Sequence, residues 1–359
     1  MTITHNFELS DEQSMIRDTV AGFVESDAAP KALHHDEHGE FVRENFTKLA
    51  ELGLLGLPIA EASGGAGLGM LTFAVALEAL AKGCGSTARL LLSQAGLCGK
   101  ALEGLESARA TLDEISAGSR LAAYVGPEFG IQAEIQGGAC TLSGRAALVS
   151  AGAVAETLVV VASTAAGKVL CLVPGAAAQR TALHALGFRA SAPAAVVFTK
   201  TPATAVATGT DADAAIARAQ LAAMIGGAAI AVGTAFASID ATRRHAGERI
   251  AFGKPLLAQP AVAHKLAEMR RKAESARHLT YHAARIADAG ADAGLPAMLA
   301  KLEACEAAVL AGDEGIQVHG GYGYVVEYHV ERHYRDAKTL EVLDLGAETL
   351  RDRVAAAIR

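Results

Sequence analysis

The stretch from Gly315 to Asp336, GIQVHGGYGYVVEYHVERHYRD, combines an amide, paired glycines, aromatic rings and charges at a spacing that packing alone does not require. An Ala-rich helical pattern runs up to His319. Gly320 and Gly321 then end it, as glycine does where the backbone needs a positive φ or a close approach. Gln317 lies about one turn earlier, so its amide can hydrogen-bond a polar ligand held over the glycines. The pattern indicates a nucleotide-cofactor site, although a helix stop beside an exposed Gln is an equal alternative.

A second segment, from Glu248 to Pro255, has a composition suited to the same ligand. It interrupts a helical pattern with Arg249 and Phe252, followed by a Gly-Lys-Pro turn. A guanidinium group beside an apolar ring is suited to binding a phosphate next to a planar ring system. Both segments therefore predict contacts to a phosphate-containing cofactor.

Taken together, these segments resemble the acyl-CoA dehydrogenase family in order and in spacing. The likeness spans most of the chain, and it is strongest after about Gly226 and weakest between Tyr124 and Thr201. The other matching segments are Phe7-x-Leu9-Ser10-Asp11-Glu12-Gln13, Leu52-Gly53-Leu54-Leu55-Gly56 with Gly64-Gly65-Ala66-Gly67-Leu68-Gly69, Glu327-Tyr328-x-Val330-Glu331-Arg332, and Tyr334-Arg335-Asp336-Ala337-Lys338.

The elements that must position these residues divide the chain into three parts. Helical periodicity up to about residue 120 predicts an N-terminal helical domain. Short β-rich runs bounded by Gly, Pro and Ser predict a small sheet domain over 121–204. Long Ala-rich helical segments over 205–359 predict a C-terminal bundle of about four helices. The expected fold class is α+β and mainly helical, in the order that the resemblance also implies.

Composition and charge restrict the possible partners. The chain has 359 residues, of which 51% are hydrophobic and 20% charged, and a net charge of -7. This charge argues against a nucleic-acid partner and gives no reason to expect binding to an anionic membrane surface. The polar start and the short Ala-rich runs at 222–237 and 304–311 predict neither a signal peptide nor a membrane span, and so a cytoplasmic protein.

The cysteines and histidines do not predict a metal site. The five cysteines are scattered and odd in number, which favours reduced thiols. His329 and His333 are one helical turn apart but lack an evident third ligand, so we expect no metal.

The resemblance implies a reaction in which a carboxylate removes the α-proton of an acyl-CoA thioester while hydride passes from the β-carbon to FAD. The usual base is a Glu in a Glu-Gly-Thr sequence, and carrying that register forward places Asp344 there. Leu343 and Leu345 are expected to withdraw this carboxylate from water and raise its pKa. The side chain of Asp344 is one carbon–carbon bond shorter than that of Glu, so its carboxylate oxygens lie about 1.5 Å farther from the substrate. A displacement of this size can cost roughly a hundredfold in rate. A helix cap or a solvent-facing Asp344 is an equal alternative.

Some relatives take their base from the first helix of the C-terminal domain instead. The matching stretch here, residues 220–227, contains no carboxylate, and the Arg expected beside it is absent, although Arg218 lies nearby. This stretch therefore supplies no residue that could act as the base.

The resemblance also assigns the cofactor contacts. Residues that reach across a subunit interface to the neighbour's FAD are kept: Arg249, Phe252, Gln317, Gly320 and Gly321. Gln259 falls one residue before the expected position of a further contact.

Contacts to the chain's own flavin are reduced. The Thr-Glu-Pro segment is replaced by Val125-Gly126-Pro127, and the loop after it is shortened to residues 128–130. The Thr of Glu-Gly-Thr is Gly346, and only Ser150 keeps a hydroxyl in the segment that normally holds a large ring.

Two hypotheses follow from this asymmetry. The first is an FAD-dependent acyl-CoA dehydrogenase that uses Asp344 and passes electrons to an electron-transfer flavoprotein or a similar acceptor. The second is a catalytically weak or silent structural subunit that completes the FAD site of a related partner. The assembly is accordingly expected to be a homo-oligomer or a hetero-oligomer.

Overall fold

The structure is a computed structural model that describes residues 8–359. Phe7, the first residue of the matched N-terminal segment, lies outside the described residues. Ser10 caps the first helix in a reciprocal capping box with Gln13: each side chain bonds the other's backbone N–H. The N-terminal helices are α1 (Asp11–Phe23), α2 (Ala29–His38), α3 (Arg43–Glu51), α4 (Gly69–Gly83), α5 (Gly85–Leu91), α6 (Lys100–Leu102) and α7 (Arg109–Ser116).

A seven-stranded sheet follows the N-terminal helices. Its strands run in the order β1-β4-β2-β3-β7-β5, with β6 on the outside of β7. An additional pairing of β4 with β5 closes the path into a ring, which protects strand edges from pairing with other chains. The strands are β1 (Ala122–Val125), β2 (Gln132–Gln136), β3 (Ala139–Val149), β4 (Thr157–Thr164), β5 (Gly167–Pro174), β6 (Gln179–Ala182) and β7 (Ala194–Thr208).

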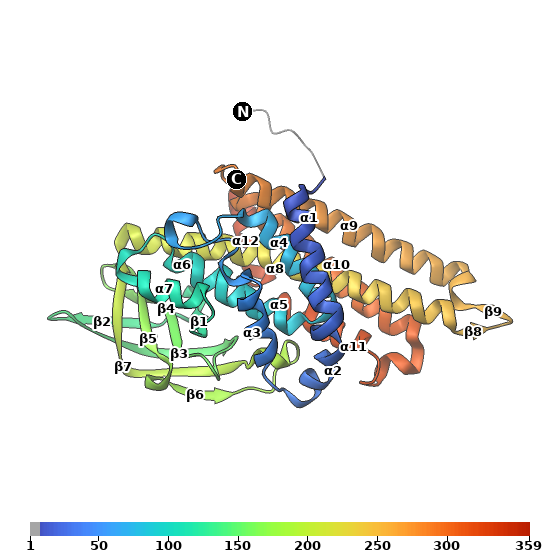
Figure 1. The fold of residues 1–359 in the computed structure, drawn as a ribbon, viewed down its shortest axis with the longest axis horizontal. Coiled ribbons are helices and arrows are strands. Elements are labelled where there is room, and N and C mark those ends of the chain that lie inside the picture. The colour runs from blue at the N-terminus through green and yellow to red at the C-terminus, as the bar shows by residue number, and fades with distance from the viewer. Residues whose placement is uncertain (1–7) are drawn as a thin grey trace.

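The C-terminal part is a bundle built around α8. Its elements are α8 (Gly209–Glu248), the hairpin of β8 (Ile250–Ala251) and β9 (Lys254–Pro255), α9 (Pro260–Asp288), α10 (Gly294–His319), α11 (Val330–Leu340) and α12 (Ala347–Ala357). Figure 1 shows the hairpin at the end of the bundle remote from the sheet. The order of helices, sheet and helices confirms the predicted fold class, while the exact domain boundaries stay predictions.

The helix α8 is longer and more apolar than the short run expected from the sequence. Its 40 residues include a window with a mean hydropathy of 1.8, which by length and composition could cross a membrane. That window is entirely buried inside the fold, so α8 is the core helix of the bundle. Small residues allow the close packing: a Cβ on Gly233 would lie 2.3 Å from the carbonyl oxygen of Glu78 in α4.

A buried polar cluster joins all three parts of the chain just before the candidate catalytic segment. Asp336 in α11 accepts a 2.6 Å hydrogen bond from the backbone N–H of Phe188 in the sheet region. The neighbouring Arg335 pairs with Asp36 of α2 and donates to the carbonyl of Leu186. These contacts fix α11 against the rest of the chain, and therefore fix the start of the loop that carries Asp344.

Candidate active site

Asp344 lies in the loop between α11 and α12, and the backbone of this loop is unusual. Asp344 has a φ of 47° and Leu345 a φ of 70°, values that residues with a Cβ rarely adopt. Such conformations persist only where the surroundings hold them in place. They also occur most often at functional sites.

Lys301 of α10 fixes the backbone of this loop through hydrogen bonds. Its Nζ donates hydrogen bonds to three successive carbonyl oxygens, at 2.5 Å for Leu343, 2.6 Å for Asp344 and 3.1 Å for Leu345. The side chain is only 2% exposed. Burial lowers the pKa of Lys301. The three acceptors nevertheless match the three donors of a protonated ammonium, so the charged form is the one that the geometry requires.

Arg89 of α5 binds the carboxylate of Asp344 in the same loop. Its Nη1 pairs with Oδ2 of Asp344, and its Nη2 donates to Oδ1 at 3.0 Å. Its Nε donates to the hydroxyl oxygen of Ser150 at 2.8 Å, so Ser150 contacts Arg89 in this chain. Arg89 is 3% exposed, and the result is a buried bidentate ion pair that engages both oxygens of Asp344.

The ion pair corrects the expectation for the pKa of Asp344. Burial by itself raises this pKa, as the flanking leucines predict. The charge and hydrogen bonds of Arg89, together with the charge of Lys301, outweigh burial and lower the pKa below its ordinary value. Asp344 neither caps a helix nor faces open water. It is a carboxylate anion in an ion pair with the buried Arg89.

Sequence analysis did not find Arg89 and Lys301, although each leaves a signal. Arg89 is the only charged residue of α5, whose seven residues are all buried. Lys301 occurs among alanines on the buried face of α10. A charge inside an apolar run must find a partner, because burying it unpaired is very costly. The sequence shows that such partners exist without showing which they are.

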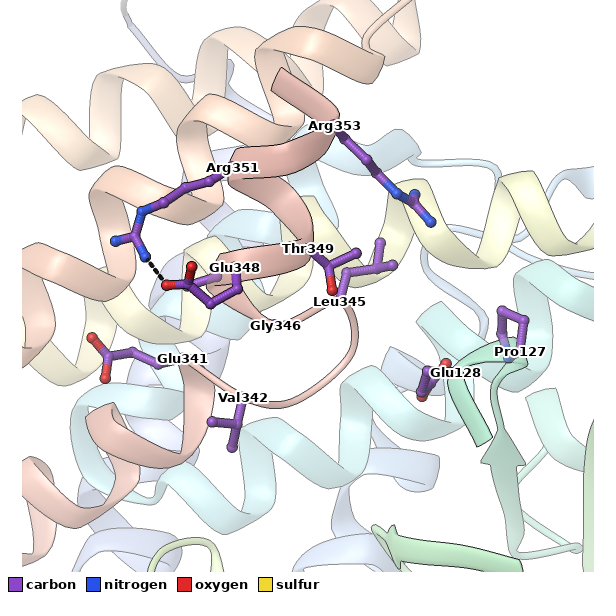
Figure 2. Close-up of a pocket in the computed structure, with 11 residues that line it drawn as sticks. Pro127, Glu128, Glu341, Val342, Leu345, Gly346, Glu348, Thr349, Arg351 and Arg353 are labelled. Carbon is purple, nitrogen blue, oxygen red and sulfur yellow. Dashed lines mark hydrogen bonds and ion pairs between the residues drawn. The ribbon is translucent and has the colours of Figure 1, made fainter. Parts of the chain in front are cut away.

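Two connected spaces lie beside Asp344. Figure 2 shows the larger, a cleft of about 890 Å³ with Pro127 and Glu128 on one side and the loop and α12 residues from Leu345 to Thr349 facing them. A smaller inner pocket, with about 10 Å³ of free space, is lined by Leu97, Tyr124, Pro127, Glu128, Ala219, Gln220, Ala223, Asp344 and Leu345. Pro127, Glu128 and Leu345 border both spaces, so the two spaces belong to one site.

Tyr124 contributes a hydroxyl group that has no hydrogen-bond partner among the described residues. Burial raises the pKa of Tyr124, and the charges of Glu128 and Asp344 add to the rise, so the phenol is protonated and able to donate. A buried donor without a partner is costly unless a ligand satisfies it. The inner pocket therefore has a group ready to bind an oxygen of a bound molecule.

Arg218 does not take the place of the missing family Arg in this pocket. Its guanidinium group donates to the carbonyls of Lys100, at 3.1 Å, and Glu103, at 2.7 Å. Arg218 therefore ties α8 to the end of α6 and does not face the pocket. Within residues 8–359, no group of three His, Cys, Asp or Glu side chains is arranged to hold a metal ion.

The residues predicted to contact FAD across an interface lie far from this pocket. About 26 residues of continuous helix separate Ala223, in the pocket wall, from Arg249, a distance on the order of 40 Å at 1.5 Å per residue. Phe252 is 97% exposed at the tip of the hairpin. Arg249 and Gln317 are exposed as well. They cannot reach the pocket of their own chain.

The glycines after Gln317 behave partly as predicted. Helix α10 ends at His319, and Gly320 has a φ of 59° with a ψ of -133°, outside the left-handed helical cap that the sequence suggested. Apart from the adjacent residues, none of the residues that the structure describes lies within 4 Å of a Cβ added at Gly320 or Gly321. The space over them is open to a ligand or a second chain. Gln259 is half-buried at the start of α9 and makes no side-chain hydrogen bond among those the structure shows.

Comparisons with known proteins agree with this architecture. Residues 10–109 match the N-terminal domain, and residues 214–358 the C-terminal domain, of acyl-CoA dehydrogenases. A probable acyl-CoA dehydrogenase of Bacillus subtilis is 33% identical, over 94% of this chain and 95% of its own length. A short-chain specific acyl-CoA dehydrogenase of Clostridium acetobutylicum is 31% identical, over 96% and 97% respectively. The solved butyryl-CoA dehydrogenase of Megasphaera elsdenii superposes with a TM-score of 0.92 at 27% identity, covering 98% and 99% of the two chains.

The chain belongs to the acyl-CoA dehydrogenase family. This membership confirms the predicted oxidoreductase class and FAD as the cofactor. It does not favour the alternative of a silent structural subunit.

The cleft offers polar groups to this cofactor and to a substrate beside it. Arg353, whose guanidinium group suits phosphate oxygens, lines the large cleft. The unpartnered hydroxyl of Tyr124 lies at the inner end of the same site. The predicted FAD contacts Arg249 and Gln317 are exposed and do not line this cleft.

Proposed function

We propose that this chain dehydrogenates a short acyl-CoA thioester between its α- and β-carbons, in the cleft between the loop at Pro127 and the loop at Asp344. One observation carries the proposal. Asp344, the carboxylate that the family resemblance assigns as the base, lines a pocket that also holds an unpartnered hydroxyl. When bound, FAD supplies the acceptor for the hydride that leaves the β-carbon.

The protein side chains perform the other tasks. Tyr124 donates a hydrogen bond to the thioester oxygen, which gains negative charge as the α-proton leaves. Arg353 binds phosphate oxygens at the mouth of the cleft. A carboxylate in the pocket takes the α-proton, and both Asp344 and Glu128 are placed there.

A short acyl chain fits this site best. The inner pocket has about 10 Å³ of free space, roughly the volume that one water molecule needs. Leu97 and Asp344 line this pocket and limit its size. The short-chain specificity named for the Clostridium relative agrees with this choice.

We further propose a cytoplasmic homo-oligomer that passes its electrons to an electron-transfer flavoprotein or a similar acceptor. The distance of Arg249 from its own pocket supports an assembly in which each chain completes the FAD site of a neighbour. The exposed Phe252, Tyr322 and Tyr324 supply apolar surface for such a contact.

The first prediction concerns turnover. The chain, purified with FAD, should lose its visible flavin absorption when butyryl-CoA is added anaerobically, and should respond much less to octanoyl-CoA and palmitoyl-CoA. Rapid-scanning absorption spectroscopy measures this bleaching. A chain that holds one FAD per subunit and is bleached by none of the three thioesters is not an acyl-CoA dehydrogenase.

The second prediction concerns the shared cofactor site. Replacing Arg249 by Ala should leave the melting temperature of the FAD-free chain unchanged, because the side chain is exposed. Loss of a charge-assisted contact to pyrophosphate should weaken FAD binding by about tenfold or more. Equilibrium dialysis with FAD measures the change, with Arg243→Ala, exposed one turn before the helix end, as the control. Equal FAD affinity in the two variants would exclude Arg249 from the site.

A further inference from the structure

Glu128 is a second carboxylate in the cleft, and its surroundings differ from those of Asp344. It follows Pro127 in the turn after β1 and borders both the large cleft and the inner pocket. Figure 2 shows it across the cleft from Leu345 and Thr349. Among the described residues, no Lys, Arg or His forms an ion pair with Glu128. Apart from a hydrogen bond with its own backbone N–H, its carboxylate is therefore available to a bound molecule.

Asp344, by contrast, is poorly arranged to take a proton. Both of its oxygens are engaged by Arg89, and Lys301 fixes its backbone. Taking a proton would cancel the charge that balances the buried Arg89, which is costly in a poorly hydrated site. A base must also present a free oxygen to the proton that it removes.

We propose that Glu128 accepts the α-proton of the acyl-CoA, and that Asp344 serves as the fixed counter-ion of Arg89. This assignment rests on the proposed dehydrogenase function. The α-carbon–hydrogen bond breaks and its proton passes to a carboxylate oxygen of Glu128. The electron pair left behind forms the new carbon–carbon double bond as hydride leaves the β-carbon for FAD, the oxidant that the family's activity supplies.

The electrostatic surroundings of Glu128 suit this role. Partial desolvation at the wall of the cleft raises the pKa of Glu128, whose residue surface is otherwise exposed, and the negative charge of Asp344 adds to the rise. A hydrogen bond from the backbone N–H of Glu128 itself opposes this rise, and the charges of Arg89 and Lys301 oppose it as well. The other titratable or charged groups that line the two spaces are Tyr124, Glu341, Glu348, Arg351 and Arg353. A base becomes more effective as its pKa rises toward the working pH.

Two substitutions separate the two carboxylates. Glu128→Gln keeps the shape of the side chain and removes its basicity. The double variant Arg89→Met with Asp344→Asn replaces the buried ion pair by uncharged side chains of similar size. Glu134→Gln, on an exposed position of β2, is the matched control for the first variant.

Each protein is assayed in two ways with butyryl-CoA. Flavin bleaching of the FAD-loaded protein reports the complete reaction. Uptake of deuterium at the α-carbon in D2O, measured by mass spectrometry with FAD-loaded and FAD-free protein, reports proton removal alone. Glu128→Gln should lower both rates by about a hundredfold or more. The double variant should keep α-exchange within about tenfold of the wild type, because Glu128 is unchanged and neutral side chains of similar size preserve the wall of the pocket.

The pH profile adds an independent readout. Wild-type α-exchange should rise with pH as Glu128 loses its proton, with a midpoint above the ordinary Glu value of about 4.3. The control variant should show the same rise, and Glu128→Gln should lack it. Unchanged exchange in Glu128→Gln, or loss of exchange in the double variant alone, would assign the proton to Asp344 and overturn the proposal.

The same data distinguish this inference from the proposed function. Wild-type exchange that depends on Glu128 without flavin bleaching would support Glu128 and reject the dehydrogenase function. Flavin bleaching that survives in Glu128→Gln would support the dehydrogenase function and reject Glu128 as the base. A wild-type protein with neither exchange nor bleaching would reject both.

Discussion

Replacing Asp344 by Asn is expected to destabilise the fold by about 3–5 kcal/mol, because the substitution leaves the charge of Arg89 buried without a counter-ion. Arg89 is 3% exposed, so water cannot take over this task. The remaining partner of the guanidinium group is the neutral hydroxyl of Ser150. Urea denaturation of the FAD-free protein, with FAD-free wild type as the reference, measures the difference in the free energy of unfolding.

The matching double variant tests the cause of this loss. Arg89→Met together with Asp344→Asn removes both charges, and a buried ion pair replaced by neutral side chains is often close to neutral in stability. We therefore expect the double variant to recover most of what Asp344→Asn loses. The double-mutant cycle isolates the coupling between the two residues. Additive losses from Arg89→Met and Asp344→Asn would show that the pair does not stabilise the loop.

The sequence was sufficient for the order of the elements because each pattern is local. Ser10 and Gln13 are three residues apart, and the capping box forms as the spacing predicts. The end of α10 before Gly320 follows from glycine alone, although the cap geometry does not. The place of Asp344 in the pocket follows from its distance along the chain to Arg335 and Asp336, which the buried cluster fixes.

The chemistry of Asp344 could not be predicted in the same way. Flanking leucines suggested a raised pKa, but Arg89 is 255 residues away in sequence and reverses the direction. Burial and charge pairing act on a pKa with opposite signs, and only the three-dimensional arrangement decides which is larger. A role for Glu128 could not be predicted from the sequence for the same reason, since the residues around it in the cleft come from distant segments.

Replacing Lys301 by Met is expected to cost at least about 3 kcal/mol, because three buried carbonyl oxygens lose their donor at once and each unsatisfied group costs about 1–3 kcal/mol. The effect should extend to function. Asp344 and Leu345 hold positive φ values that are unfavourable without support, so the loop should relax and change the wall of the inner pocket. Butyryl-CoA should then bleach the flavin more slowly even well below the melting temperature.

The matched control for this variant is Lys265→Met. Lys265 forms an ion pair with Glu314 at the surface, where 37% of its side chain is exposed, and such pairs contribute about 0–1 kcal/mol. A comparable loss in the two variants would mean that any Lys→Met change weakens the bundle. A loss confined to Lys301→Met, with slower bleaching in that variant alone, would show that one buried ammonium group supports both the fold and the geometry of the site. The conformation of the loop, with its positive φ values at Asp344 and Leu345, is then set by Lys301 of α10 as much as by the loop's own sequence.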